Sequence, residues 1–114
     1  MLPAMPTRLA DARRHALSLP EASESPHHHM SSFRVRGKIF ATVPPEGSFL
    51  HLFVDEAARD AAVAAEPEAF EPLLWGGKVV GVRAVLALAR PAAVKALLQA
   101  AWLHRAPASI KDRR

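Results

Sequence analysis

The fold is decided by the stretch Ser32-Phe33-Arg34-Val35-Arg36-Gly37-Lys38-Ile39-Phe40-Ala41-Thr42. Apolar and charged residues alternate in its first half, so Phe33 and Val35 point to one side of a strand and Arg34 and Arg36 to the other. Gly37 then lies where a turn or a bulge is sterically easy, and an apolar run resumes after it. The pattern predicts two short strands, or one bent strand, with one buried face.

The segment before this stretch predicts one helix and a loop. Thr7 is placed to cap a helix that runs to about Ser18, and Pro20 stops it because proline lacks the backbone N–H that a helix needs. Residues 21–30 show neither the period of a helix nor that of a strand and are expected to form a loop.

The segment after it predicts a turn, a strand and a second helix. The turn is at residues 44–47, and residues 49–54 are apolar on both faces except for His51, which indicates a central strand. Asp55 is placed to cap a helix of about ten residues that ends before Pro67. Pro67 is also suited to begin a further helical turn across residues 66–70.

The last third predicts a hairpin and a long helix. Residues 73–85 are extended in character and are interrupted by Gly76-Gly77, which favours a tight turn. Pro91 opens a helix whose apolar residues recur at the spacing of a buried stripe: Val94, Leu97, Leu98, Ala101 and Trp102.

This order of elements predicts an α+β fold. Helices separated by runs of antiparallel strands usually cover one face of a sheet and leave the other open, which gives a two-layer sandwich. At 114 residues there is room for one core, so residues 1–114 are expected to form a single domain with its core between about residues 7 and 108.

Five marks in the right order make the chain resemble the MmcQ/YjbR family. They are the 32–42 stretch, Leu17-Ser18-Leu19-Pro20-Glu21, Glu66-Pro67-Glu68-Ala69-Phe70, Trp75-Gly76, and Ala101-Trp102 followed by Ala106-Pro107. The resemblance implies a fold similar to type III secretion chaperones and a DNA-binding function without agreed catalytic residues. The chain departs from relatives at residues 77–81, which lack their aromatic.

The composition limits the cellular compartment and the kinds of chemistry that are expected. There is no cysteine, which removes disulfides, thiolate metal sites and cysteine nucleophiles. The opening residues lack the pattern of a secretory signal, and no apolar run reaches the roughly 18 residues of a membrane span. A cytoplasmic protein without a membrane association is therefore expected.

Charge is unevenly distributed along the chain. The net charge is +4, and residues 1–14 and 111–114 are both basic. Acidic residues crowd the segment 55–71, whereas residues 78–105 contain five bases and no acid. Such separation of sign suggests a polyanionic partner such as DNA.

The candidate nucleic-acid-binding residues follow from this pattern: Arg34, Arg36, Lys38, Lys78, Arg83 and Trp75. Arginine suits phosphate because its planar fork donates two parallel hydrogen bonds. Trp75 lies beside two glycines in an expected turn and is the best candidate for an exposed stacking aromatic, while Phe33, Phe40 and Trp102 are expected in the core. The alternative for the basic residues is a solvated strand edge that prevents aggregation.

Other chemistry finds little support. Residues His27-His28-His29 invite a metal interpretation, with Glu24 or His51 as a further ligand, but consecutive side chains diverge in an extended loop, so an exposed polar loop is expected instead. There is no nucleophile elbow around Ser48, and Gly76-Gly77-Lys78 lacks the rest of a phosphate loop. We therefore expect no enzyme activity, no cofactor and no metal.

Two functions remain. The first is a weakly sequence-specific nucleic-acid-binding domain that uses a basic sheet surface. The second is a protein-interaction or adaptor module, since the acidic helix and the basic strands could dock a protein partner or a second copy, giving a monomer or weak dimer.

Overall fold

Arg36 and Gly37 form the turn of a hairpin within the sheet. The computed structural model describes residues 6–111, and in it β2 (Met30–Val35) turns into β3 (Lys38–Val43) through Arg36 and Gly37, both of which have positive φ. Phe40 is an additional residue between the pairs Phe33–Ala41 and Arg34–Ile39, which makes a bulge. Because of this bulge Phe33 and Phe40 are both buried, as predicted.

The sheet has six strands, and all of its pairings are antiparallel. The strands that join β2 and β3 are β1 (Ala22–His27), β4 (Phe49–Leu52), β5 (Phe70–Trp75) and β6 (Lys78–Val85). Their order is β1-β2-β3-β4-β6-β5, so β4 is central, as the sequence predicts, and β1 and β5 are the edges.

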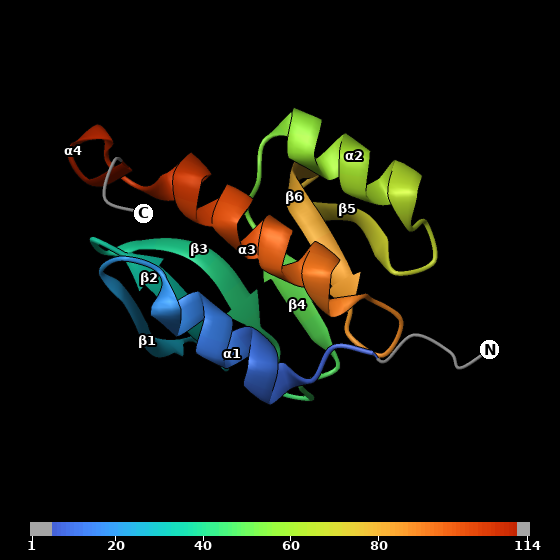
Figure 1. Ribbon diagram of the computed structural model, residues 1–114, viewed down its shortest axis with the longest axis horizontal. Helices are drawn as coiled ribbons and strands as arrows, with labels where there is room; N and C mark the ends of the chain where they lie inside the picture. Colours follow the sequence, from blue (N-terminus) through green and yellow to red (C-terminus); the bar gives the residue numbers. More distant parts are fainter. Residues whose placement is uncertain (1–5, 112–114) are drawn as a thin grey trace.

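Helices cover one face of this sheet, which confirms the predicted two-layer α+β sandwich (Figure 1). They are α1 (Leu9–Ser18), α2 (Glu56–Ala65), α3 (Pro91–Arg105) and the short α4 (Ala108–Lys111). In Figure 1 α1, α2 and α3 lie in front of the strands, with α2 over the β5–β6 side. None of the helices in the described range is long and apolar enough to cross a membrane.

The core lies between α3 and the sheet. The predicted stripe of α3 is buried over its whole length, from Val94 to Trp102. The Trp102 ring has no exposed surface, and its Nε1 donates a hydrogen bond to the carbonyl of Pro20 at 2.9 Å. This bond ties α3 to the connection between α1 and β1, where a tryptophan N–H would otherwise be buried without a partner.

Three sequence predictions are wrong. Residues 21–30 are not a loop, because β1 occupies most of them and pairs with β2 along its full length. The mixed polar residues of β1 hid the strand, since an edge strand needs no apolar period. Residues 66–70 form a hydrogen-bonded turn rather than helix and lead directly into β5.

The third correction concerns Thr7. It does not cap α1: the residue before the helix is Arg8, which makes no side-chain cap. Thr7 is buried instead, and its Oγ1 donates to the carbonyl of Ala89 at 2.9 Å. By contrast Asp55 caps α2 as predicted, accepting the backbone N–H of Ala58 at 2.9 Å.

The pairing of β4 with β6 requires glycine at position 81. A Cβ at Gly81 would lie 2.0 Å from the carbonyl oxygen of Leu52, which belongs to the backbone and cannot rotate away. We therefore expect Gly81→Ala to lower the free energy of unfolding by about 3 kcal/mol or more, measured by urea denaturation.

The matched control is Gly76→Ala in the β5–β6 turn. Nothing lies within 4 Å of a Cβ there, and the only cost is its φ of +58°, about 1–2 kcal/mol. Equal losses in the two variants would contradict the assigned role of Gly81.

Candidate nucleic-acid interface

Two hairpin turns lie at the same end of the sheet. Lys38 begins β3 after the β2–β3 turn, and Lys78 begins β6 after the β5–β6 turn. The end of β4 lies between these two strands, because Leu52 pairs with both Ala41 and Val82. The sheet order therefore places both lysines at one end, although 40 residues of sequence separate them.

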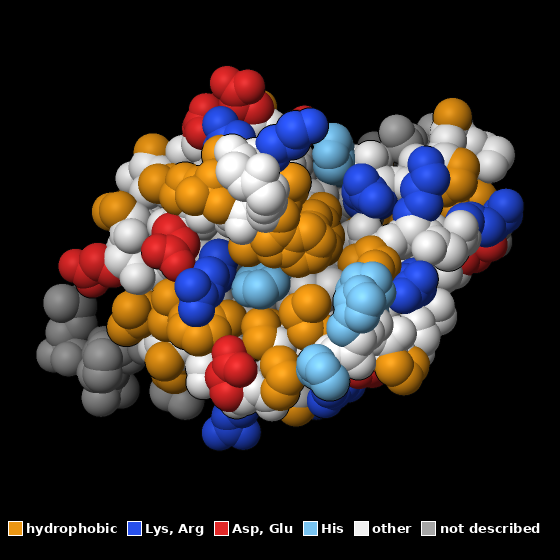
Figure 2. Space-filling view, turned by 180° about the vertical axis from the view of Figure 1, so that it is seen from behind, with side chains coloured by type: hydrophobic (Ala, Val, Ile, Leu, Met, Phe, Trp, Pro, Cys, Tyr) orange, Lys and Arg blue, Asp and Glu red, His pale blue; other side chains and the backbone are white. Residues whose placement is uncertain are grey.

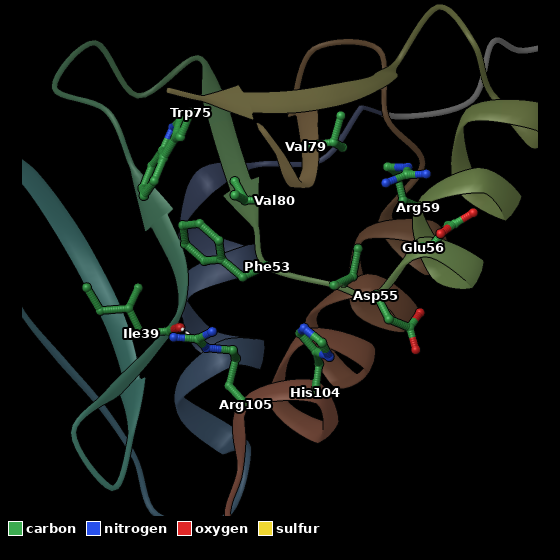
Figure 3. Close-up of a pocket in the computed structure, with 11 residues that line it drawn as sticks. Ile39, Phe53, Asp55, Glu56, Arg59, Trp75, Val79, Val80, His104 and Arg105 are labelled. Carbon is green, nitrogen blue, oxygen red and sulfur yellow. Dashed lines mark hydrogen bonds between the residues drawn. The ribbon is translucent and has the colours of Figure 1, made fainter. Parts of the chain in front are cut away.

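A cavity of about 630 Å³ opens between the two turns and the last turn of α3 (Figure 3). We call it the hairpin cleft, and it is lined by Ile39, Phe53, Val54, Asp55, Glu56, Arg59, Trp75, Val79, Val80, His104 and Arg105. In Figure 3 these side chains come from β3, the β4–α2 connection, α2, the β5–β6 hairpin and α3. The cleft thus joins segments that are distant in the sequence.

The wall of the cleft is aromatic on its sheet side. Trp75 keeps 40% of its surface exposed, and its ring meets Phe53 edge-on with the centroids 5.0 Å apart. Phe53 is itself buried and packs against the Trp75 ring. A fixed and partly exposed indole is a surface on which a planar ring can stack.

Arg59 and Arg105 line the cleft, and Lys38 and Lys78 begin strands at the same end of the sheet. Arg105 donates from Nε to the carbonyl of Ile39 at 3.0 Å, so the last turn of α3 is fixed against β3. Lys38 and Lys78 are exposed, and no ion pair involves either of them among residues 6–111. Arg59 lies on the α2 side and pairs with Asp60. Arg59, His104 and Arg105 are not among the binding residues predicted from the sequence, although Arg105 ends the acid-free segment.

The predicted cations do not form one cluster on the sheet. Arg36 lies in the β2–β3 turn rather than on the strand and pairs with Glu21, with Nη2 3.1 Å from Oε2. Arg83 lies in the middle of β6 and pairs with Glu71 at 3.3 Å. Arg34 is on β2 and donates to Ser32 Oγ at 3.0 Å, without a carboxylate partner in the described chain.

The view from behind shows the face of the sheet that the helices leave open (Figure 2). Lysine and arginine side chains gather toward one end of this face, while hydrophobic and histidine side chains occupy much of its middle. The basic side chains on this face thus lie mainly toward one end, and its middle is less basic.

A row of polar residues crosses the middle of the open face. Paired positions follow one another across all six strands: Ser25, Ser32, Thr42, His51, Arg83 and Glu71. Ser32 is satisfied, since its Oγ donates to the carbonyl of Ser25 at 2.7 Å. Three consecutive members have buried atoms that lack a partner in the described chain, namely Thr42 Oγ1, His51 Nδ1 and Arg83 Nε.

The pKa of His51 is lowered from its ordinary value. Burial is the main cause, because it removes water from the charged form, and the nearby positive charge of Arg83 acts in the same direction. Glu46 opposes them weakly. His51 is therefore neutral at pH 7, and its ring presents one N–H donor and one acceptor nitrogen.

The histidine run is part of a hairpin rather than a loop. His27 ends β1, and His28, with a φ of +58°, forms the turn into β2. The rings of His27 and His28 are 4.5 Å apart and tilted against each other. No group of three or more potential metal ligands is assembled among the described residues.

The comparisons with known proteins concern almost the whole described domain. A family model described as YjbR matches residues 17–104. The crystal structure of Deinococcus radiodurans protein DR2400, with the domain DUF419, is similar at a TM-score of 0.70 and 21% identity, covering 90% of this chain and 80% of that one. At this identity the similarity concerns the fold. No curated protein matches the chain.

The lowered pKa of His51 predicts a loss of stability in weak acid. The unfolded chain takes up a proton near pH 6.5, whereas the folded chain does so only at lower pH, so the free energy of unfolding falls as the pH drops from about 7 to about 5. We expect His51→Gln to weaken this dependence, measured by thermal denaturation across that range.

A second histidine contributes in the same direction. Burial and then Lys95 lower the pKa of His15, so part of the pH dependence should remain in His51→Gln and become weaker still when His15→Gln is added. If the stability of His51→Gln depended on pH as strongly as that of the wild type, the assignment to His51 would be contradicted.

Proposed function

The chain belongs to the YjbR family, and we propose that it is a non-catalytic domain that binds single-stranded nucleic acid in the hairpin cleft with weak sequence preference. The observation that carries the proposal is a partly exposed indole, Trp75, that lines the same cleft as Arg59 and Arg105, at the end of the sheet where Lys38 and Lys78 begin their strands. Single-strand binding proteins combine these two features: the cations follow the phosphates and the aromatic ring stacks on bases.

The balance of charge supports this placement. Arg34, Lys38, Lys78 and Arg105 have no carboxylate partners among residues 6–111. On the opposite side of the cleft Asp55 and Glu56 are negative, and Asp55 is already engaged as the cap of α2. A polyanion would therefore lie toward β3 and α3 and away from the start of α2.

The arrangement of the helices favours the binding of single-stranded nucleic acid over the binding of duplex DNA. Recognition of duplex DNA commonly inserts a helix with free basic residues into the major groove. The basic helix near the chain start is α1, and two of its arginines are engaged: Arg13 pairs with Glu24 and Arg14 with Asp11. In the cleft Arg105 of α3 is held by the carbonyl of Ile39 and Arg59 of α2 pairs with Asp60, so neither helix presents a row of free basic residues, and Trp75 needs an unstacked base.

The salt dependence of binding tests the proposal. If Arg34, Lys38, Lys78 and Arg105 each neutralise one phosphate of a single strand, the logarithm of the affinity should fall with the logarithm of the salt concentration at a slope of about −2 to −3. Fluorescence anisotropy of a labelled oligodeoxythymidine, titrated at several salt concentrations, measures this slope.

Charge reversal locates the surface. We expect Lys38→Glu and Lys78→Glu each to weaken binding by about fivefold to tenfold and to flatten the slope. The matched control is Lys95→Glu, which makes the same change of charge at an exposed position of α3 on the helix side. Flat or millimolar binding by the wild type, or an equal loss in the control, would overturn the proposal.

An adaptor function is the second candidate, and exposed apolar residues favour it. Leu74, Trp75 and Val79 are all well exposed on the β5–β6 hairpin, and β5 is an edge strand with free backbone groups. A protein partner could add a strand there and cover these side chains.

Light scattering and a pull-down at low and high salt separate the two candidates. The adaptor function predicts a partner, or a second copy, that is retained in high salt and lost in Leu74→Asp. A protein that stays monomeric and recovers no partner would remove this candidate.

A further inference from the structure

A second cavity lies on the open face of the sheet, next to the hairpin cleft and separated from it by Trp75. It measures about 560 Å³, and its polar lining consists of Glu46, His51, Glu71 and Arg83. Trp75 lines both cavities. We call this second cavity the sheet pocket, and its floor is the middle of the polar row that crosses the six strands.

The floor of the sheet pocket contains hydrogen-bonding capacity that the fold does not use. His51 Nδ1 and Arg83 Nε are buried and have no partner within residues 6–111. Thr42 lies beside His51 on the neighbouring strand and is fully buried, and its Oγ1 also lacks a partner within the described residues. Such atoms are uncommon in proteins, because each buried polar group without a hydrogen bond costs about 1–3 kcal/mol.

Flat groups border the pocket on two sides. The guanidinium carbon of Arg83 lies 3.7 Å from the centroid of the Phe49 ring, so one side of that planar group is covered by the ring. On the other side of His51 the Trp75 ring meets the imidazole edge-on at 6.4 Å. Planar guanidinium and aromatic groups are the surfaces on which unstacked bases rest in proteins.

Charge decides which part of a nucleic acid fits. Arg83 is already paired with Glu71, and Glu46 adds a further negative charge, so the pocket disfavours a phosphate. A planar, uncharged heterocycle with donors and acceptors on its edge matches the neutral imidazole, the guanidinium and the two carboxylates. We propose that the sheet pocket receives one nucleobase.

The binding of a base that is part of a strand rests on the proposed function. The binding of a free nucleoside does not. The phosphates of a strand held in the hairpin cleft would pass Trp75, which brings a neighbouring base to the mouth of the pocket. A free nucleoside could enter the same pocket without the cleft. The shared chemistry is the base, and the experiment distinguishes its two sources.

The test uses probes with and without bases. The protein is titrated with uncharged nucleosides (adenosine, cytidine and thymidine), with an oligodeoxythymidine, and with an abasic oligomer of the same length. NMR chemical shifts follow His51 and the Trp75 indole, and anisotropy gives the affinities. We expect nucleosides to shift both resonances, and the abasic oligomer to bind about tenfold more weakly than the oligodeoxythymidine.

Variants assign the effect to the pocket. His51→Phe keeps a ring but removes both nitrogens, and should abolish the nucleoside shifts of Trp75 and lower oligodeoxythymidine affinity to that of the abasic oligomer. Trp75→Leu, at an exposed position, should abolish the nucleoside shifts of His51 and lower oligodeoxythymidine affinity in the same way, and it serves if the first variant fails to fold. Lys38→Glu should weaken both oligomers alike and leave the nucleoside shifts unchanged.

The outcomes separate this inference from the proposed function. Equal affinity for the two oligomers, with no nucleoside shifts, overturns the base pocket and the stacking on Trp75, and leaves intact only the binding of the strand's phosphates by the cations. Nucleoside shifts without oligomer binding support the pocket and remove the proposed function. The absence of any shift or binding overturns both.

Discussion

The antiparallel pairing of β4 with β6 is the contact on which the rest of the structure depends. It joins the strands of the first half of the chain to the β5–β6 hairpin, and it forms only because Gly81 lets β6 approach the backbone of Leu52. This one pairing brings the two hairpin turns to the same end of the sheet and places His51 opposite Arg83. Both the hairpin cleft and the sheet pocket are consequences of it.

The two cavities differ in their electrostatics, and the ligands that we propose for them differ for this reason. Arg105 lines the cleft, and Lys38 and Lys78 begin strands at the same end of the sheet; none of the three has a carboxylate partner in the described chain. In the sheet pocket Glu71 offsets Arg83, and what remains is unsatisfied hydrogen bonding at Thr42, His51 and Arg83. The fold bears the cost of these unpaired atoms without any gain of its own, which is why we interpret them as part of a binding surface.

Much of the fold was predictable, because its signals are local. The alternation through Phe33 and Val35, the cap at Asp55, the Gly76-Gly77 turn and the stripe of α3 all occur within a few residues and depend on backbone geometry or on one buried face. The failures have the opposite character. Strand β1 has a polar edge sequence that resembles a loop, and Thr7 uses its hydroxyl to bind Ala89, a residue 82 positions away.

The fold class, the position of the helix layer, the core aromatics and the exposure of Trp75 therefore follow from the amino-acid pattern, since burial periodicity and turn residues act over short distances. How the charges combine depends on the folded chain. Sequence reasoning could not show that Arg36 and Arg83 lie against Glu21 and Glu71, or that Arg105 arrives beside Ile39 from the last helix. Ion pairs and cavities depend on distances across the sheet, and those distances are set by strand order and register, which the one-dimensional pattern does not contain.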